Sequence, residues 1–232
     1  MLLKLDANEG MWAEYAYPYI RLIAEAATDK VKQQEVWMTR IHPLQLQNGR
    51  ILLPLYSDGY NFSMAAISDD DGATWQASKP IVGLAGIQPT FVQKQSGDIV
   101  AYMRETGNPP SRVQKSVSQD QGESWSVMQE TDIPNPGSSL EVIALQDGKH
   151  WVMAYNDSEH TRGTMAVSLS DDEGQSWKWT RHIGTDHSYA YPSMILTKDG
   201  NVHITYTFKD NAGKGNTIKH DVMNVEWIQA GN

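Results

Sequence analysis

The sequence has no cysteine among its 232 residues. Disulfides, thiolate metal sites and cysteine nucleophiles are therefore excluded. Phenylalanine is also scarce, with 3 residues against 8 tryptophans and 10 tyrosines. Trp and Tyr join an apolar ring to a polar tip, so this bias favours regularly packed turns or a sugar-binding surface.

Positive charge is in deficit as well. Lys and Arg number 19 against 28 Asp and Glu, which gives a formal net charge of −9, and there is no basic run. An acidic chain repels nucleic acid and anionic lipid, so we expect neither as a partner. An anionic ligand would have to be held by a local cluster of arginines.

Long apolar runs are missing too, and none approaches the roughly 18 residues that cross a bilayer. The first residues, Met1–Asp6, lack the apolar stretch and cleavage site of a signal peptide. This predicts a cytoplasmic protein, or an N-terminally shortened secreted or periplasmic one. The 40% of hydrophobic residues suffices for a folded core.

Three markers recur about every 50 residues, the period of some propeller blades. The first is the pattern Ser-x-Asp-x-Gly-x-x-Trp, which occurs at 68–75, 118–125 and 170–177. Its defining residues are Ser68, Asp70, Gly72, Trp75, Ser118, Asp120, Gly122, Trp125, Ser170, Asp172, Gly174 and Trp177. The second marker is a turn ending in glycine, at Gly49, Gly97, Gly148 and Gly200. The third is a proline that opens each unit, at Pro43, Pro89, Pro136 and Pro192.

Short apolar runs lie between these markers. Second strands are predicted at 50–56, 99–103, 151–155 and 202–206, and third strands at 62–67, 113–117 and 164–169. Four strands in each unit of about 50 residues match a propeller blade. The predicted fold is therefore all-β, a β-propeller of four-stranded antiparallel blades, with about four to five blades in this chain.

The Ser-x-Asp pattern reads as a hairpin turn between the third and fourth strands of a blade. The Asp carboxylate can accept hydrogen bonds from backbone N–H groups of its own turn. Gly supplies a backbone angle that a Cβ would strain, and we expect the Trp to pack between adjacent blades. We interpret these residues as structural.

The repeats resemble the Asp boxes, or BNR repeats, of the sialidase (neuraminidase) superfamily, and most closely its exo-α-sialidase branch. The resemblance covers roughly Trp37 to Trp227. Further matching motifs lie at 37–40, 88–89, 102–104, 134–136, 155–158 and 189–193. The boxes are specific for the fold, but they also occur in lyases, other glycosidases and non-enzymes.

The resemblance implies six or seven blades, more than this chain can supply. We therefore divide it into an N-terminal segment, residues 1–36, and a sialidase-like Asp-box propeller, residues 37–232. The segment is either a partial blade, since Glu14–Pro18 echoes Ser188–Pro192, or a capping helix over Ile20–Gln34. Open sheet edges invite pairing, so we expect a homo-oligomer that covers them.

Polar residues recur at the positions that should share one end of the blades. These predicted substrate-binding residues are Arg40, His42, Arg104, Arg112, Asn135, Arg162, His187 and His220. Arginines bind a sugar carboxylate through bidentate forks, and sialidases use three of them. The resemblance favours Arg40, Arg104 and Arg162 for this carboxylate clamp.

Sialidases cleave their substrate with a Tyr nucleophile. Tyr191 and Tyr189 are the candidate phenols, Glu105 and Glu141 the candidate activating carboxylates, and Asp157 and Asp58 the candidate acids. The favoured function is an exo-glycosidase that hydrolyses a terminal acidic sugar of the sialic-acid type from an acidic glycan or oligosaccharide.

Two alternatives remain open. The same arginines, histidines and tyrosines fit a polysaccharide lyase acting on uronate-containing glycans, which needs a carboxylate neutraliser, a base and an acid. The small number of blades fits a non-catalytic carbohydrate-binding propeller. We expect no cofactor and no metal, because the histidines lack paired ligand spacing.

Overall fold

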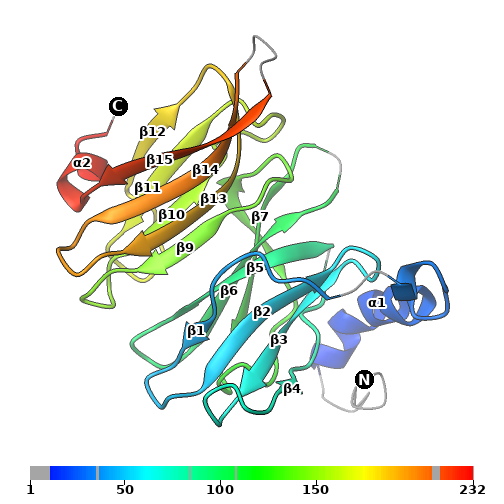
Figure 1. Cartoon of the computed structure of the whole chain (residues 1–232). Coiled ribbons are helices and arrows are strands. Elements are labelled where there is room, and N and C mark those ends of the chain that lie inside the picture. Colours follow the sequence, from blue (N-terminus) through cyan, green and yellow to red (C-terminus); the bar gives the residue numbers. More distant parts are fainter. Residues whose placement is uncertain (1–10, 35–36, 84, 108, 211–214, 232) are drawn as a thin grey trace. The chain divides into compact units, whose positions relative to one another are not determined.

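A computed structural model describes residues 11–34, 37–83, 85–107, 109–210 and 215–231. Over these residues the chain forms four antiparallel sheets (Figure 1). The predicted fold class, an all-β propeller of antiparallel blades, is confirmed.

Each blade follows the chain order from its innermost strand outward. The first blade contains β1 (Leu44–Gln45), β2 (Ile51–Ser57), β3 (Phe62–Ser68) and β4 (Gln76–Ala77). The second contains β5 (Gly86–Gln93), β6 (Ile99–Glu105), β7 (Arg112–Ser118) and β8 (Gln129–Pro134). The third contains β9 (Glu141–Ala144), β10 (Trp151–Tyr155), β11 (Met165–Ser170) and β12 (Trp179–Gly184).

The fourth blade has three strands, β13 (Ser188–Leu196), β14 (Val202–Lys209) and β15 (Asn216–Met223). In place of a fourth strand the chain forms helix α2 (Val225–Gln229). Asn224 caps this helix, since its side chain accepts a hydrogen bond from the Trp227 N–H. The helix packs against β11 and β12 of the third blade, and Ile228 is fully buried there.

The described residues fall into two compact units. Unit 1 comprises those within Met1–Gln93, Gly97–Gly107 and Gln114–Glu130, and unit 2 comprises those within Lys94–Ser96, Asn108–Val113 and Thr131–Asn232. In unit 1 a core of Leu52, Ile67, Phe91 and Trp125 joins the first two blades. In unit 2 a corresponding core, which includes Val167 and Ile204, joins the third blade to the fourth.

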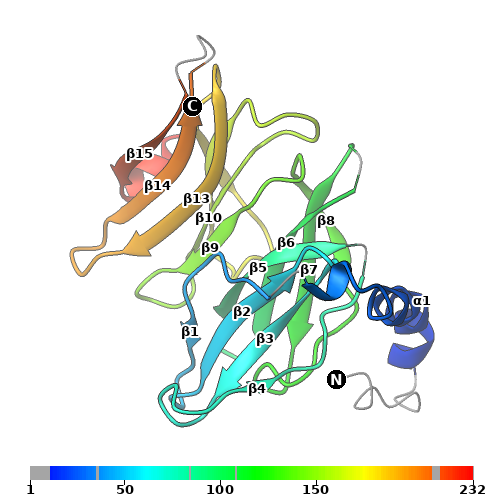
Figure 2. The ribbon, with the colours of Figure 1, turned by 45° about the vertical axis from the view of Figure 1, so that its right-hand side comes forward.

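The N-terminal segment is helical where the structure describes it. Helix α1 spans Met11–Ala26 and a short 3-10 helix, η2, spans Lys32–Gln34. Glu14–Pro18 therefore lies in a helix, although the similar Ser188–Pro192 lies in strand β13. Figure 1 and Figure 2 both show α1 beside the first blade, where Ile23 packs with Phe62 and Val82.

The Asp boxes form the predicted hairpin turns. In the third box the Ser176 N–H donates to Asp172 Oδ1 (2.8 Å), and the Gly174 N–H donates to Ser170 Oγ (2.8 Å). The same two bonds form in the other boxes. The box glycines have φ between +73° and +89°, a backbone conformation that glycine adopts without strain.

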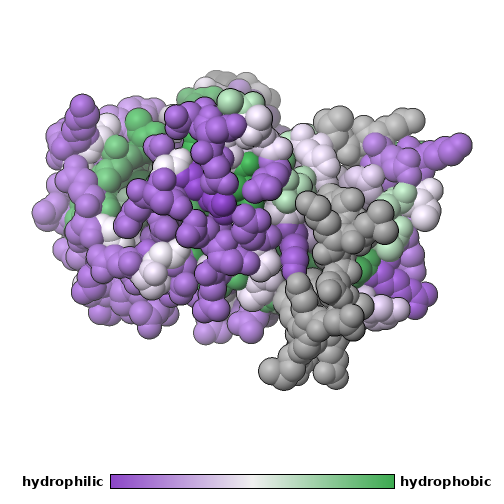
Figure 3. Space-filling view, turned by 90° about the horizontal axis from the view of Figure 1, so that it is seen from below, coloured by the Kyte–Doolittle hydropathy of each residue, from purple (hydrophilic) through white to green (hydrophobic). Residues whose placement is uncertain are grey.

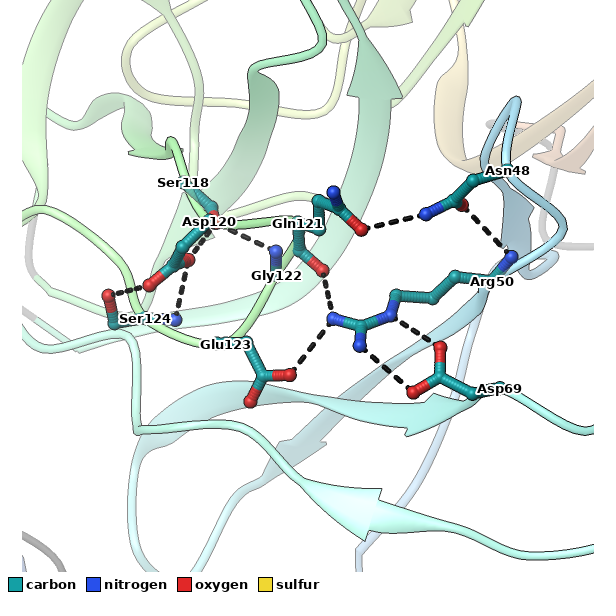
Figure 4. Close-up of polar contacts among 9 residues, drawn as sticks. All are labelled: Asn48, Arg50, Asp69, Ser118, Asp120, Gln121, Gly122, Glu123 and Ser124. Carbon is teal, nitrogen blue, oxygen red and sulfur yellow. Dashed lines mark hydrogen bonds and ion pairs between the residues drawn. The ribbon is translucent and has the colours of Figure 1, made fainter.

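The first two boxes are also joined to each other within unit 1 (Figure 4). Arg50 donates two hydrogen bonds to the carboxylate of Asp69, at 2.7 and 2.9 Å. It also donates to Glu123 Oε1 (2.9 Å) and to the carbonyl of Gln121 (3.2 Å). One guanidinium thus connects a box of the first blade to a box of the second, and these contacts raise its pKa against the effect of burial.

The ionised carboxylates of the Asp boxes predict that the free energy of unfolding decreases at acid pH. Burial raises the pKa of Asp172, but hydrogen bonds from Ser176 and Ser170 outweigh it and lower the pKa from 3.8 to about 2. The pKa of Asp70 and that of Asp120 are lowered too. A carboxylate whose pKa is lower in the folded state stabilises the fold above pH 4, and this contribution is lost as pH falls towards 2.

The measurement is urea denaturation of the protein and of Asp172→Asn at several pH values. At pH 6 we expect a lower midpoint for the variant, and we expect the difference to shrink between pH 4 and pH 2.5. A difference that stayed constant over this range would contradict the role of the ionised carboxylate.

The surface in Figure 3 is mostly hydrophilic, with small apolar patches between the polar residues. One face of the fourth blade, however, exposes the side chains of Ile195, Ile218 and Val222. The predicted self-association stays a prediction. Among the described residues, no helix combines the length and the apolar character that crossing a bilayer requires.

Candidate functional site

Most of the predicted site residues lie near one end of their blade. In the third blade Ser170 of the Asp box pairs with Trp151, where β10 begins, while Asn156 and Asp157 follow its other end. The other boxes have the same register, with Ser68 opposite Ile51 and Ser118 opposite Ile99. The boxes therefore lie at the opposite end from the predicted site, as expected.

In unit 2 this end brings Arg162 and Tyr191 together. The Arg162 Cζ lies 5.4 Å from the centre of the Tyr191 ring, within the range of a cation–π contact. The Arg162 Nη2 donates to the carbonyl of Gly137 (3.1 Å), and the Arg162 carbonyl accepts from the Tyr189 N–H (2.8 Å). The loops before β9 and β11, together with strand β13, thus position one guanidinium beside one phenol.

Tyr191 lies at an irregularity in β13. The pairing of β13 with β14 shifts register between Ala190 and Ser193, and Tyr191 has φ +55°. A bulge re-aims a side chain and is common beside active sites, and a residue with this backbone conformation stores about 1–3 kcal/mol of strain. The ring is 42% exposed, so the phenol is open to a ligand.

Strand β5 of unit 1 has the same combination of a register shift and a residue with positive φ. Its register with β6 shifts between Ile87 and Thr90, and Gln88 has φ +56°. Both strained residues, Gln88 and Tyr191, directly precede one of the recurring prolines. The prolines mark the repeats in the sequence, but their spacing does not predict the bulges.

Tyr189 differs from Tyr191 in its deeper burial and in the carboxylate that lies beside its hydroxyl. Its ring is 4% exposed and its hydroxyl donates to Asp186 Oδ1 (2.9 Å). Burial and this acceptor raise the pKa of Tyr189 to about 12. Both effects oppose formation of a phenolate at Tyr189, whereas Tyr191 is exposed.

A buried polar layer lies behind the pair. Glu141, Ser138, Ser139 and Asn156 are each fully buried. The Asn156 Nδ2 donates to the Tyr189 carbonyl (3.1 Å), and Glu141 Oε2 accepts from the Met194 N–H. Among the described residues, the hydroxyls of Ser138 and Ser139 have no hydrogen-bond partner. These buried residues hold β9, β10 and β13 together. Of the four, Glu141 was predicted as a site residue from the sequence.

Other predicted residues of unit 2 have protein partners. Arg112 forms an ion pair with Glu159 and donates to the carbonyl of Asp132 (2.7 Å). Asn135 is buried and holds its own turn, because its side chain donates to the Ser138 carbonyl and accepts from the Ser138 N–H. These contacts explain the two side chains as structural.

Asp157 lies 2.9 Å from the Nε2 of His182. His187 lies at the start of the fourth blade between two carboxylates, 3.5 Å from that of Asp186 and 3.7 Å from that of Asp210. The edge of its ring packs on Phe208. Asp157 and His187 thus each have a side-chain partner of complementary chemistry.

His220 was predicted at the start of a third strand, and this placement is wrong. Strand β15 begins at Asn216, and His220 lies in its middle opposite Thr205. Its Nε2 is 3.0 Å from the Nδ1 of His203, and the two rings stack. Strand β15 already begins four residues before His220, so His220 lies on the sheet instead of at its end.

Unit 1 contains Arg40, His42, Asp58, Arg104 and Glu105. Asp58 and His42 are exposed, whereas Arg40 and Arg104 are partly buried. Arg104 and Glu105 are consecutive in β6, so their side chains point to opposite faces of the sheet. Gln114, whose side chain donates to Glu105 Oε2 at 3.5 Å, marks the face of Glu105. Glu105 is thus separated from Arg104.

Among the described residues, no group of three or more His, Asp or Glu side chains could hold a metal ion. The site geometry accordingly consists of guanidinium, phenol, carboxylate and imidazole groups. These can bind an anion and transfer protons.

The fold and this strand-end geometry define the class, a propeller built from Asp-box blades. The profile of the BNR repeat-like domain family matches residues 27–204, and the chain belongs to this family. The resemblance to sialidases is likewise confirmed.

An anhydrosialidase of Macrobdella decora is 25% identical over 198 residues, which are 77% of this chain and 26% of that protein. The leech intramolecular trans-sialidase complexed with 2,7-anhydro-Neu5Ac superposes with a TM-score of 0.69 at 22% identity, covering 81% of this chain and 32% of that one. An α-L-arabinanase of Penicillium chrysogenum superposes with a TM-score of 0.59 at 18% identity, covering 82% and 64%. The chain thus spans about a third or less of the sialidase relatives.

Proposed function

We propose that the chain provides part or all of the site of a sialidase-like exo-glycosidase, which removes a terminal acidic sugar from a glycan. The observation that supports this proposal most directly is the pairing of Arg162 with the exposed, strained Tyr191. A guanidinium binds a carboxylate, and a phenol beside it can attack the carbon that bears that carboxylate.

The charges of the reacting groups favour a phenol in this position. A sialic acid carries its carboxylate on the anomeric carbon, so a carboxylate nucleophile would meet a like charge at close range. A phenol approaches without that repulsion. We assign the nucleophile to Tyr191, the carboxylate contact to Arg162, and the proton donor to Asp157 with His182.

The predicted part of Arg40 and Arg104 in a carboxylate clamp stays a prediction, because both residues belong to unit 1. Glu105 has no role in the proposed site, since it faces away from Arg104. Asp58 and Arg112 have none either.

The test is turnover of a fluorogenic α-sialoside by the purified chain, beside a fluorogenic α-L-arabinofuranoside as a neutral-sugar control. Release of fluorophore from the sialoside, reduced at least 100-fold in Tyr191→Phe, is expected if the phenol is the nucleophile. Turnover of the arabinoside alone would overturn the acidic-sugar proposal. An unsaturated product from a uronate polymer would instead indicate a lyase.

A further inference from the structure

Unit 1 contains a pocket that is separate from the proposed site. It lies between helix α1 and the first two blades and has a volume of about 230 Å³. We call it the α1 pocket. All of α1 precedes the family match, which begins at residue 27. The pocket is therefore built in part from a segment that the family match does not include.

The α1 pocket is mainly apolar. Phe62 and Val82, which are 3% and 1% exposed, contribute from the first two blades, and Ile23 contributes from α1. Tyr19 and Tyr60 add two aromatic side chains. The volume is below the range of pockets for drug-sized ligands, so a small ligand with an apolar or aromatic body fits best.

One carboxylate also lines this apolar surface. Glu105, at the end of β6, is half-buried, and its carboxylate accepts a hydrogen bond from the Gln114 side chain. No described Lys or Arg pairs with it. Burial raises the pKa of Glu105, and the neighbouring Glu130 raises it further, with Gln114 acting in the opposite direction. A bound cation would offset both of the effects that raise the pKa.

We propose that the α1 pocket binds a small primary amine with an aromatic or alicyclic body. The ammonium group would pair with Glu105, and the ring would lie among Tyr19, Tyr60 and Phe62. Tyrosine rings also attract a cation that comes near their faces. The net charge of −9 favours cations over anions at the surface in general, so the test must separate the pocket from that overall field.

Titration calorimetry with phenethylamine at pH 7.5 tests the proposal, with 3-phenylpropanoate as a ligand of similar shape and opposite charge. We expect phenethylamine to bind with a Kd of roughly 1 mM or below, as befits so small a ligand. We expect no measurable binding of 3-phenylpropanoate. Affinity for the amine should fall at acid pH, as Glu105, whose pKa is raised by burial, takes up a proton.

Three variants locate the binding. Glu105→Gln removes the charge in the pocket, and Leu22→Arg places a bulky cation at its exposed edge, where Leu22 is 61% exposed; each should weaken binding at least tenfold. Glu130→Gln removes the same charge from a residue that does not line the pocket and should retain binding. Equal weakening by Glu105→Gln and Glu130→Gln, or equal binding of both ligands, would overturn the proposal. A sialoside assay on the same samples measures the proposed glycosidase activity separately. Failure of amine binding can therefore be told apart from failure of the proposed function.

Discussion

Substitution of Arg162 by alanine is expected to lower kcat/KM for an α-sialoside about 100-fold, a loss of about 2.7 kcal/mol of transition-state stabilisation. The guanidinium is held in place from two sides, by the Gly137 carbonyl and by the stacked Tyr191 ring. A positioned cation binds the substrate carboxylate without reorganising. Arg162→Lys should recover only part of the loss, because an ammonium group cannot form the bidentate fork.

Arg181→Ala is the matched control. Arg181 also belongs to unit 2, lies over an aromatic ring (4.0 Å from that of Trp227) and donates to a backbone carbonyl, but it was never part of the proposed site. Steady-state kinetics on folded protein should show kcat/KM within about threefold of the parent. If Arg162→Ala and Arg181→Ala lowered kcat/KM equally, the effect of Arg162 would be structural and the carboxylate contact would be refuted.

The second large effect is on stability. Trp125→Ala is expected to lower the free energy of unfolding by about 3–5 kcal/mol, the usual cost of deleting a buried aromatic side chain. Trp125 is 2% exposed, stacks on Phe91 with ring centres 4.9 Å apart, and lies in the core that joins the first two blades.

Trp75→Ala is the control, because Trp75 occupies the same position of the first Asp box but is 45% exposed. Its indole N–H donates to the carbonyl of Gly72 (2.9 Å), so we expect a loss of about 1 kcal/mol or less. Urea denaturation followed by circular dichroism compares the two variants. Equal losses would mean that the box tryptophans act locally, through their turns, and not through the core between the blades.

These two tryptophans also show where the repeat pattern stops being informative. All three boxes have the same four defining residues, and the sequence predicts that each Trp packs between blades. In the structure Trp125 does so and Trp75 does not. Burial depends on which neighbouring blade covers the ring, and that is a long-range property that an eight-residue pattern does not contain.

The candidate site, too, could be predicted from the sequence only in part. Arginines and tyrosines at the strand ends were predictable from their recurrence beside the turn markers. The difference between Tyr189 and Tyr191 was not, because it depends on a bulge in β13 and on the side chain of Arg162, which is distant in the sequence. The partner of Arg112, Glu159, likewise comes from another blade.

The all-β class and the four repeats could be predicted from the sequence alone. So could the two different ends of each blade, with boxes at one end and polar residues at the other. These follow from hydrogen bonds within a few residues, such as those of Ser170, Asp172 and Gly174, which form wherever that pattern occurs. The exposure of Tyr191, the different partners of Arg162 and Arg112, and the face of β6 on which Glu105 lies could be learned from the folded structure alone. Those outcomes depend on strand pairing and burial between segments far apart in the chain, where local residue preferences have no influence.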